Sequence, residues 1–420
     1  MAKDLRHVLA GCLTASMLLM LCNMIKKDHI DPLLGDISVY SNGKEEKDVA
    51  TKRYLSTVYS ESSSLWGGDD NEVLIPCWRK STNVKPRQSR GYVFITLAQD
   101  AEYHLFEIAN AVVVAQHLGA SLVLPNIRWS EAGEKWMFGD IYDVKKLVES
   151  LDGKVSLAMD PQDVEVSNSK KVTTVRVPNM VSKEFINSQI EPIFTRTNLW
   201  LATYFPSPEH KSKPNPYACL AMFDTLKLRP ELQESIDSMV LTLRSLSSHS
   251  RGRFIAVDYR TETLLHQSSS KCHEDNATTE ARNCIDDAKH IALFLQKVGF
   301  AKETTIYLTL NEWHSSVEPL REAFPNTYTK DMIILANDKP NFLDPKHPEL
   351  RGITDVYISS VADVYVQTST NVFSDNVVAR RIATGKTQVL VPDKGSSDLE
   401  KDFVPTYISL KKHWAYSCFC

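Results

Sequence analysis

The chain has 420 residues and a formal net charge of −4 at pH 7, and 43 % of its residues are hydrophobic. This length is enough for two domains with full cores, and the apolar fraction is that of an ordinary globular protein. Because the chain has no basic excess, its composition gives no support to nucleic acid as a partner.

An uncharged apolar run covers residues 8–25. Its length is close to the roughly 17–25 residues that a membrane-spanning helix needs. A cleaved signal peptide would show a shorter apolar core and a small-residue cleavage site, so we favour an uncleaved anchor. Lysine or arginine lies on both sides, which leaves the orientation weakly determined. The sequence therefore predicts a cytoplasmic tail at 1–7, a transmembrane signal anchor at 8–25 and a flexible, serine-rich stem at 26–72.

Six cysteines lie beyond the predicted anchor, at Cys77, Cys219, Cys272, Cys284, Cys418 and Cys420. They allow up to three disulfides, with the pairing left open. Cys418 and Cys420 are too close to pair comfortably with each other, so each is expected to reach a distant cysteine. A glycosylation sequon at Asn276 agrees with a lumenal domain. The alternative is a cytosolic protein with free cysteines, and no C-x-x-C spacing suggests a zinc site.

Strand and helix patterns alternate from Val73 onward. They predict, in chain order, a strand at 91–97, a helix at 101–118, a strand at 121–127 and a helix at 140–151. Gly119 stops the first helix, and strand–helix–strand at this spacing is a parallel βαβ unit. After a mixed region, prolines between residues 206 and 216 mark a break that we interpret as the interdomain connection.

The second half of the chain repeats this alternation and predicts a doubly wound α/β domain. The expected helices lie at 229–246, 285–298, 317–324 and 371–384. The expected strands lie at 254–258, 304–310, 331–336 and 388–392, with a helix or turn and then a short strand over 353–368.

Arg260 follows the buried strand 254–258 after one tyrosine. Ligands of open parallel sheets bind outside the carboxyl ends of the strands. A guanidinium keeps its charge and offers a planar fork of donors to phosphate oxygens. Arg260 therefore predicts phosphate binding, and an ion pair with Asp258 or Glu262 in a surface loop is the equally open alternative.

A second phosphate-binding element is predicted within residues 363–376, which pass from a strand into a helix. The N-terminus of a helix presents unpaired N–H groups and a positive dipole end. The hydroxyls of Thr368, Ser369 and Thr370 add donors, and one of the three is expected to cap the helix. Such an arrangement can hold a pyrophosphate without a metal.

Several motifs of other enzyme classes are absent from the sequence. There is no Asp-x-Asp pair, no G-x-G-x-x-G after a strand, no Walker A loop and no G-x-S-x-G elbow. This weighs against metal-dependent sugar-nucleotide enzymes, NAD enzymes, P-loop enzymes and serine hydrolases.

Taken together, several stretches resemble the plant O-fucosyltransferase-like glycosyltransferases over about residues 73–410. They are the strand ending in Arg260, Asn311-Glu312 after the next strand, and residues 318–331 and 355–386. The stretches "EYH" (102–104), "HLGASLVLP" (117–125), "CLAMFDTLKLRPE" (219–231) and the ending "AYSCFC" are similar to the mannan-synthesis-related branch of that family.

The resemblance implies an α/β, GT-B-like fold with two Rossmann-like domains facing a cleft, behind the transmembrane helix and stem. The acceptor-side domain would cover 73–206 and the nucleotide-sugar domain 207–420. It implies a Golgi membrane protein, single-pass type II, whose lumenal part is an inverting glycosyltransferase of plant mannan biosynthesis. The expected co-substrate is a nucleotide sugar with GDP as the nucleotide, and neither cofactor nor metal is expected. The expected partners are a polysaccharide acceptor and a mannan synthase.

Carried over by motif, Arg260 is the arginine that binds the donor phosphates. Asp363 and the turn Thr368–Ser369–Thr370 match the nucleotide- and phosphate-binding segment of the family. The family usually has His-x-Arg at the strand end, and Asp258 stands here in place of the histidine. The glycine-rich loop of the family after the first strand is replaced by residues 97–100, which contain no glycine.

These departures leave the activity and the general base open. Asp258, Glu312 and Asp100 are the candidate bases, and His104 could line the cleft. One alternative function is a non-catalytic accessory protein that supports a mannan synthase. Another is an O-fucosyl- or rhamnosyltransferase that acts on a different glycan or on protein.

Overall fold

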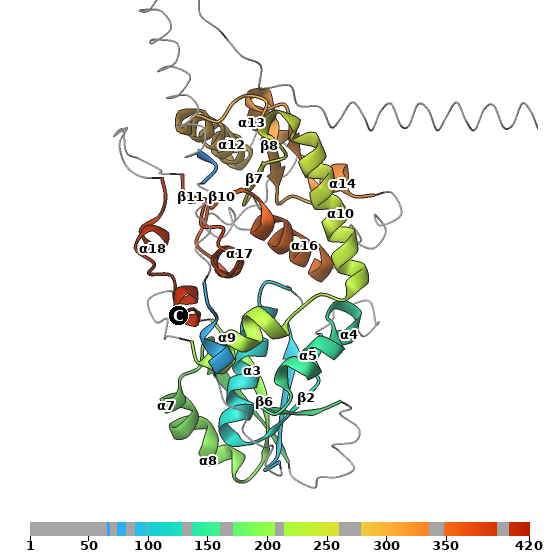
Figure 1. Cartoon of the computed structure of the whole chain (residues 1–420), viewed down its shortest axis with the longest axis vertical. Coiled ribbons are helices and arrows are strands. Elements are labelled where there is room, and N and C mark those ends of the chain that lie inside the picture. The colour runs from blue at the N-terminus through green and yellow to red at the C-terminus, as the bar shows by residue number, and fades with distance from the viewer. Residues whose placement is uncertain are drawn as a thin grey trace, which may run out of the picture. The chain divides into compact units, whose positions relative to one another are not determined.

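The computed structural model describes residues 65–67, 74–80, 89–98, 100–127, 137–159, 171–205, 214–259, 279–335, 348–392 and 403–420. All of them belong to one compact unit, Ser60–Cys420. The predicted anchor, nearly all of the predicted stem, Arg260 and the Asn276 sequon lie outside these ranges. Among the residues inside them, no helix combines the length and apolarity needed to span a bilayer. The described residues form two parallel β-sheets with their helices (Figure 1).

The first sheet has the strand order β4-β2-β1-β6-β5, and β3 pairs with the end of β1. Its strands are β1 (Tyr92–Leu97), β2 (Ser121–Val123), β3 (Asn126–Ile127), β4 (Ser156–Ala158), β5 (Val172–Pro178) and β6 (Asn198–Tyr204). Every pairing is parallel. The strand predicted at 121–127 is two strands, because Pro125 between them has no N–H to donate to a ladder.

Helix α3 (His104–Leu118) joins β1 to β2 as predicted. Gly119 ends it with a φ of 63°, a left-handed conformation that glycine adopts without strain. The helix predicted at 140–151 is two helices, α4 (Phe138–Ile141) and α5 (Val144–Leu151). The break arises at Asp143, whose side chain caps α5 by accepting from the N–H of Lys146 at 2.9 Å.

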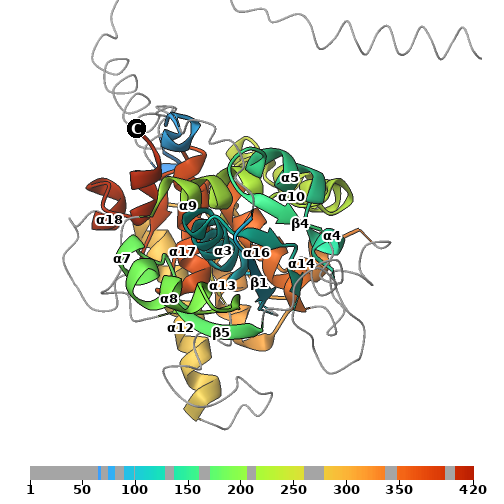
Figure 2. The ribbon, with the colours of Figure 1, turned by 90° about the horizontal axis from the view of Figure 1, so that it is seen from below.

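Helical segments α7 (Lys183–Phe185), η2 (Ile186–Ile190) and α8 (Glu191–Phe194) join β5 to β6. Two further segments, α9 (Pro216–Leu220) and η4 (Ala221–Thr225), pack against α3 of the first sheet (Figure 2). The sequence placed these two in the second domain, so the chain leaves the first sheet later than its prolines indicated. The passage to the second sheet is made by α10 (Pro230–Leu246), a helix that was predicted.

The second sheet has the order β11-β10-β7-β8-β9, and all of its pairings are parallel. Its strands are β7 (Phe254–Val257), β8 (Thr305–Leu308), β9 (Thr327–Tyr328), β10 (Val364–Val366) and β11 (Val389–Leu390). All residues of β7, β8, β10 and β11 are buried, which is typical of strands covered on both faces. In chain order the sheet is 5-4-1-2-3, a doubly wound order that changes direction between β7 and β10.

The helices of the second sheet are α12 (Thr279–Val298), η6 (Ser315–Val317), α13 (Glu318–Ala323), α14 (Lys330–Ile333), α16 (Pro348–Val361) and α17 (Val372–Ala383). Most of the predictions here are confirmed to within a few residues. The strand predicted at 331–336 is wrong, because residues 330–333 are helix α14 and the strand is β9, a few residues earlier. A short apolar run does not distinguish a strand from a helix by periodicity.

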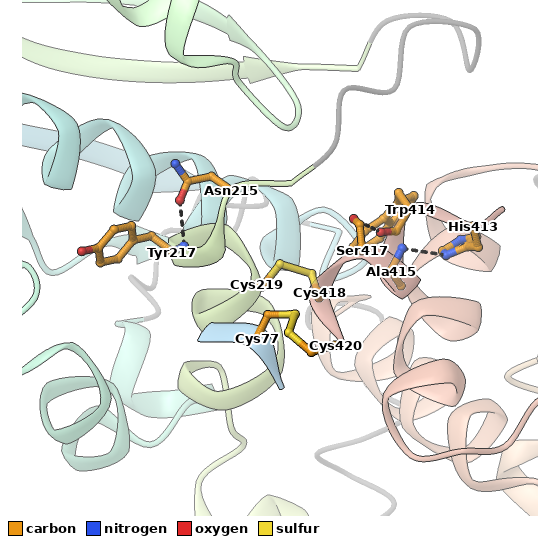
Figure 3. Close-up of a disulfide and its surroundings, with 10 residues drawn as sticks. All are labelled: Cys77, Asn215, Tyr217, Cys219, His413, Trp414, Ala415, Ser417, Cys418 and Cys420. Atoms are coloured by element: carbon orange, nitrogen blue, oxygen red, sulfur yellow. Dashed lines mark hydrogen bonds between the residues drawn. A yellow bond between two sulfur atoms is a disulfide. The ribbon is translucent and has the colours of Figure 1, made fainter. Parts of the chain in front are cut away.

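The C-terminal residues return to the first sheet through α18 (Thr406–Ser409) and η7 (Trp414–Cys418). Disulfides join Cys219 to Cys418 and Cys77, in η1 (Cys77–Lys80), to Cys420 (Figure 3). The expectation that Cys418 and Cys420 each reach a distant cysteine is confirmed. A third disulfide would involve Cys272, which lies outside the described residues.

Candidate functional site

The candidate site is the carboxyl edge of β7 and β10, where the order of the second sheet changes direction. Asp258 follows β7, and its N–H donates to the carbonyl oxygen of Val366 at 3.0 Å. The residues 367–371, which we call the donor turn, follow β10 and lead into α17. Ligands of doubly wound sheets bind outside this edge. The structure therefore brings Asp258 and the predicted hydroxyl residues together.

Asp258 accepts two hydrogen bonds from the donor turn. The hydroxyl of Thr368 donates to the backbone oxygen of Asp258 at 2.5 Å, and the hydroxyl of Ser369 donates to its Oδ2 at 3.3 Å. Asp258 is 1 % exposed, whereas Thr370 is exposed. The carboxylate is thus directed at the turn, and its burial makes it a poor candidate for a base that must reach an acceptor hydroxyl.

Asn371 is the N-cap of α17, so the prediction that Thr368, Ser369 or Thr370 caps this helix is wrong. The side-chain oxygen of Asn371 accepts from the N–H of Ser374 at 2.8 Å, and the hydroxyl oxygen of Ser374 accepts from the N–H of Asn371 at 3.0 Å. This capping box starts the helix at Val372 and leaves the three hydroxyl residues in the turn before it. They precede the positive end of a 12-residue helix, which favours an anionic ligand.

Gln367 fixes the shape of the donor turn. Its Nε2 donates to the carbonyl oxygen of Ser369 at 2.9 Å and to the hydroxyl oxygen of Ser374 at 3.2 Å. Its Oε1 accepts a short hydrogen bond from the hydroxyl of Tyr407. The side chain is 5 % exposed, so these bonds define its orientation. Sequence reasoning missed Tyr407, because nothing near it in the chain points to this edge.

Asp363 lies at the other edge of the sheet. It precedes β10, and its Oδ2 accepts from the N–H of Phe254 at 3.0 Å and from Arg244 at 3.4 Å, while Lys386 is 3.9 Å from its Oδ1. The length of β10 separates it from the donor turn. The structure thus does not bring Asp363 together with the other predicted residues. Asp363 instead links the amino ends of β7 and β10.

His104 is a core residue at the first sheet. It is fully buried, its Nε2 donates to the carbonyl oxygen of Ala98 at 2.6 Å, and its Nδ1 accepts from the hydroxyl of Tyr142 at 2.7 Å. Burial lowers the pKa of His104 to about 4, despite the opposing hydrogen bond to Ala98. The N–H of Ala98 donates to Glu107 at 2.8 Å. His104 therefore fixes the loop after β1 as a neutral imidazole and does not line a cleft.

The loop after β1 borders α17. The backbone oxygen of Glu102 accepts from Nδ2 of Asn376 at 3.2 Å, which links the first sheet to the helix behind the donor turn. Asp100, one of the predicted bases, is exposed in this loop. The sequence does not show that this loop lies beside α17, because the two segments are far apart in the chain.

Glu312, another predicted base, is exposed beyond β8, the neighbour of β7. The preceding Asn311 is held by Lys330, whose ammonium donates to its Oδ1 at 3.0 Å. The same ammonium, fully buried, donates to the Arg351 carbonyl and to Asp355 Oδ2, each at 2.9 Å. Sequence reasoning missed this buried lysine, although its position beside the apolar run 332–336 was a signal.

In the ranges that the structure covers, no three His, Cys, Asp or Glu side chains gather in a way that would hold a metal ion. Arg260, the predicted phosphate ligand, follows Tyr259 immediately but is outside those ranges. Tyr259 itself is 2 % exposed, and its N–H donates to the hydroxyl of Thr309 at 2.9 Å. Metal-independent chemistry and phosphate binding by Arg260 therefore stay predictions.

The sequence of the chain is similar to those of known proteins. The family model of the GDP-fucose protein O-fucosyltransferases matches residues 106–383. The protein Mannan synthesis-related 1 of Arabidopsis thaliana is 42 % identical over 100 % of both chains. The protein Mannan synthesis-related of Trigonella foenum-graecum is 35 % identical, again over 100 % of both. A crystal structure of NodZ α-1,6-fucosyltransferase, soaked with GDP-fucose, is similar over 69 % of this chain and 92 % of its own, with a TM-score of 0.41 and 16 % identity.

The family model covers well over half of the chain, and the two plant relatives align with its whole length. The chain therefore belongs to the GDP-fucose protein O-fucosyltransferase family, among the plant members whose relatives are named mannan synthesis-related.

Proposed function

We propose that this protein is a Golgi glycosyltransferase of plant cell-wall mannan biosynthesis, acting on galactomannan or glucomannan. The family is named for the use of GDP-fucose, and the relatives that align with the whole chain are named for mannan synthesis. The observation that carries the proposal is the donor turn at the β7–β10 edge, with Thr368 and Ser369 bonded to Asp258 in front of the N-terminus of α17.

In the proposed reaction the diphosphate of a nucleotide sugar, with GDP as the nucleotide, binds at this edge. An acceptor hydroxyl attacks the anomeric carbon from the opposite side, and the bond to the diphosphate breaks with its electron pair leaving on the diphosphate oxygen. Arg260, the exposed hydroxyl of Thr370 and the positive end of α17 stabilise that charge, because the hydroxyls of Thr368 and Ser369 already donate to Asp258. By analogy with oxyanion holes, each such donor contributes roughly 3–4 kcal/mol to the transition state.

The base that accepts the proton of the acceptor hydroxyl must be accessible. Glu312, beyond the end of β8, and Asp100, beyond the end of β1, are exposed, whereas Asp258 is buried. We therefore rank Glu312 and Asp100 above Asp258. The hydrogen bond from Asn376 to the Glu102 carbonyl brings the loop after β1 beside α17, and we propose that the first domain presents the acceptor in a GT-B-like arrangement.

The two disulfides favour an oxidising compartment. This agrees with a lumenal catalytic part behind a type II anchor at residues 8–25. We further propose that the acceptor is a neutral polysaccharide and that the protein has a mannan synthase as its partner.

The purified full-length protein should transfer sugar from one of GDP-mannose, GDP-fucose or UDP-rhamnose to a mannan acceptor. Arg260→Ala should lower both turnover and GDP affinity at least tenfold, because it removes a phosphate ligand. Arg253→Ala is the matched control, since Arg253 stands at the amino end of the same strand and stacks on Trp66 at 4.8 Å. Turnover that Arg260→Ala leaves intact, or absence of both transfer and nucleotide binding, would overturn the proposal.

A non-catalytic role beside a mannan synthase is the second candidate, and one observation favours it. The N–H of Ala98 already donates to Glu107, so this part of the loop cannot offer it to an anionic ligand. If Arg260→Ala folds and still restores mannan in deficient plants, the accessory role is supported. Transfer to another glycan or to protein would show instead in an acceptor panel.

A further inference from the structure

The C-terminal residues 403–420, which we call the strap, contact helix α9 beside the first sheet and helix α17 of the second. At their far end, Cys418 is bonded to Cys219 on α9 and Cys420 to Cys77, with Cα–Cα distances of 5.5 and 5.3 Å (Figure 3). The aromatic ring of Trp414 packs on Phe106 of α3 at 5.7 Å between centroids. The far end of the strap is therefore fixed to the helices of the first sheet, both covalently and by packing.

The near part of the strap holds the donor turn through Gln367. The hydroxyl of Tyr407 donates to Gln367 Oε1, which leaves Nε2 to donate to Ser369 and Ser374. Without that hydroxyl, the carbonyl oxygen of a side chain that is 5 % exposed loses this donor. The amide then has one contact fewer to fix its orientation, which weakens its hold on Ser369 and Ser374.

A second contact of the strap engages the first turn of α17. Nε2 of His413 lies 3.1 Å from Asp375 Oδ1, and Nε1 of Trp414 donates to Asp375 Oδ2 at 3.3 Å. Both carboxylate oxygens of Asp375 are thus engaged by the strap, close to where an anionic ligand would bind. The N–H of His413 also donates to the Tyr407 carbonyl at 3.0 Å, so the two contacts belong to one unit.

We propose that the strap is a positioning element of the donor site, which holds the donor turn in the geometry that binds a diphosphate and keeps both carboxylate oxygens of Asp375 bonded to the strap. It acts through Gln367 and Asp375, so Tyr407, His413 and Trp414 are positioning residues and do not touch the donor. The disulfide Cys219–Cys418 ties this positioning to α9 beside the first sheet, because Trp414 and Cys418 lie on the same short helix, η7. The inference rests on the proposed function.

Hydrogen–deuterium exchange of the full-length protein tests the structural half of this proposal without any ligand. Tyr407→Phe keeps the ring and removes only the hydroxyl, and it should speed exchange at least threefold in residues 367–375. Cys219→Ser/Cys418→Ser should act in the same direction by loosening η7, to a smaller extent because Cys77–Cys420 still holds the end of the strap. Tyr92→Phe, at the amino end of β1 in the other sheet, removes a tyrosine hydroxyl and should leave residues 367–375 unchanged. Equal exchange in all variants would overturn the proposal.

Calorimetric titration with GDP tests the functional half. Tyr407→Phe and the double serine variant should bind GDP threefold to tenfold more weakly than wild type, while Tyr92→Phe binds it equally well. In transfer assays the loss should appear in KM for the donor more than in kcat. Faster exchange with unchanged GDP affinity would show that the strap does not position a donor site. Wild-type protein that binds no GDP would contradict the proposed function, and the exchange comparison would still decide whether the strap holds the turn.

Discussion

His104 illustrates how burial sets the chemistry of a single residue in this protein. The sequence suggested that this imidazole at the start of α3 could line a cleft, but it is fully buried and bonded to Tyr142 and Ala98. Its pKa is lowered to about 4, chiefly by that burial, so it is neutral at physiological pH. The sequence placed His104 at the start of the first helix. It carries no information on the burial of the side chain, which depends on residues far along the chain.

The buried state of His104 predicts a loss of stability in acid. As the pH falls, His104 is protonated near pH 6.5 in the unfolded chain but only near pH 4 in the folded protein. The free energy of unfolding should fall by about 3 kcal/mol between these values. His104→Gln should flatten the fall in urea-unfolding curves recorded from pH 7 to pH 4. His249→Gln, which removes an exposed imidazole, is the control, and an equal slope in both variants would exclude His104 as the cause.

Lys330 and Asp355 form a buried ion pair with a 2.9 Å separation, in which Tyr307 donates to the second carboxylate oxygen at 2.6 Å. Lys330→Met should lower the free energy of unfolding by roughly 3–5 kcal/mol, because it leaves a buried carboxylate without its cation. The double variant Lys330→Met/Asp355→Leu should recover part of that loss. Lys145→Met, which removes an exposed lysine on α5, should have little effect. Additive losses in the double variant would show that the two charges are not coupled.

At the scale of elements, the sequence predicted those that local patterns define. The all-apolar strand β7 and helix α3 with its glycine stop were found because burial on both faces and a 3.6-residue period leave clear signatures. Helix α14 was predicted as a strand because its apolar run is too short to reveal a period. The cap of α17 was assigned one to three residues early, since four consecutive polar residues can each cap a helix and only the backbone geometry selects Asn371.

The capping asparagines of two helices separate stability from donor binding. Asn371 caps α17, and Asn215 caps α9 by accepting from the N–H of Tyr217 at 2.8 Å. Replacing either with alanine should cost roughly 0.5–2 kcal/mol of folding free energy. Only Asn371→Ala should also weaken GDP binding, because only that cap shapes the donor turn. Thermal unfolding and GDP titration of both variants check this, and parallel losses of GDP affinity would point to a general effect of stability.

At the scale of the whole molecule, the candidate site depends on contacts that no local pattern contains. Sequence reasoning brought Asp258 and the residues 368–370 to one edge, because both follow strands of one parallel sheet. It also grouped Asp363 with them, although a residue before a strand lies at the opposite edge. The two disulfides and the contact between Glu102 and Asn376 join segments at least 199 residues apart, and the strap reaches Gln367 across 40 residues, so only the folded structure reveals them.

The central claim is that a nucleotide diphosphate binds at the carboxyl edge of β7 and β10, in front of α17. Hydrogen–deuterium exchange of the wild-type protein with and without saturating GDP tests it most directly. GDP should slow exchange in residues 368–375 and leave the amino edge around Asp363 and Lys386 unaffected. Protection confined to that amino edge, or an exchange map that GDP does not change anywhere, would contradict it.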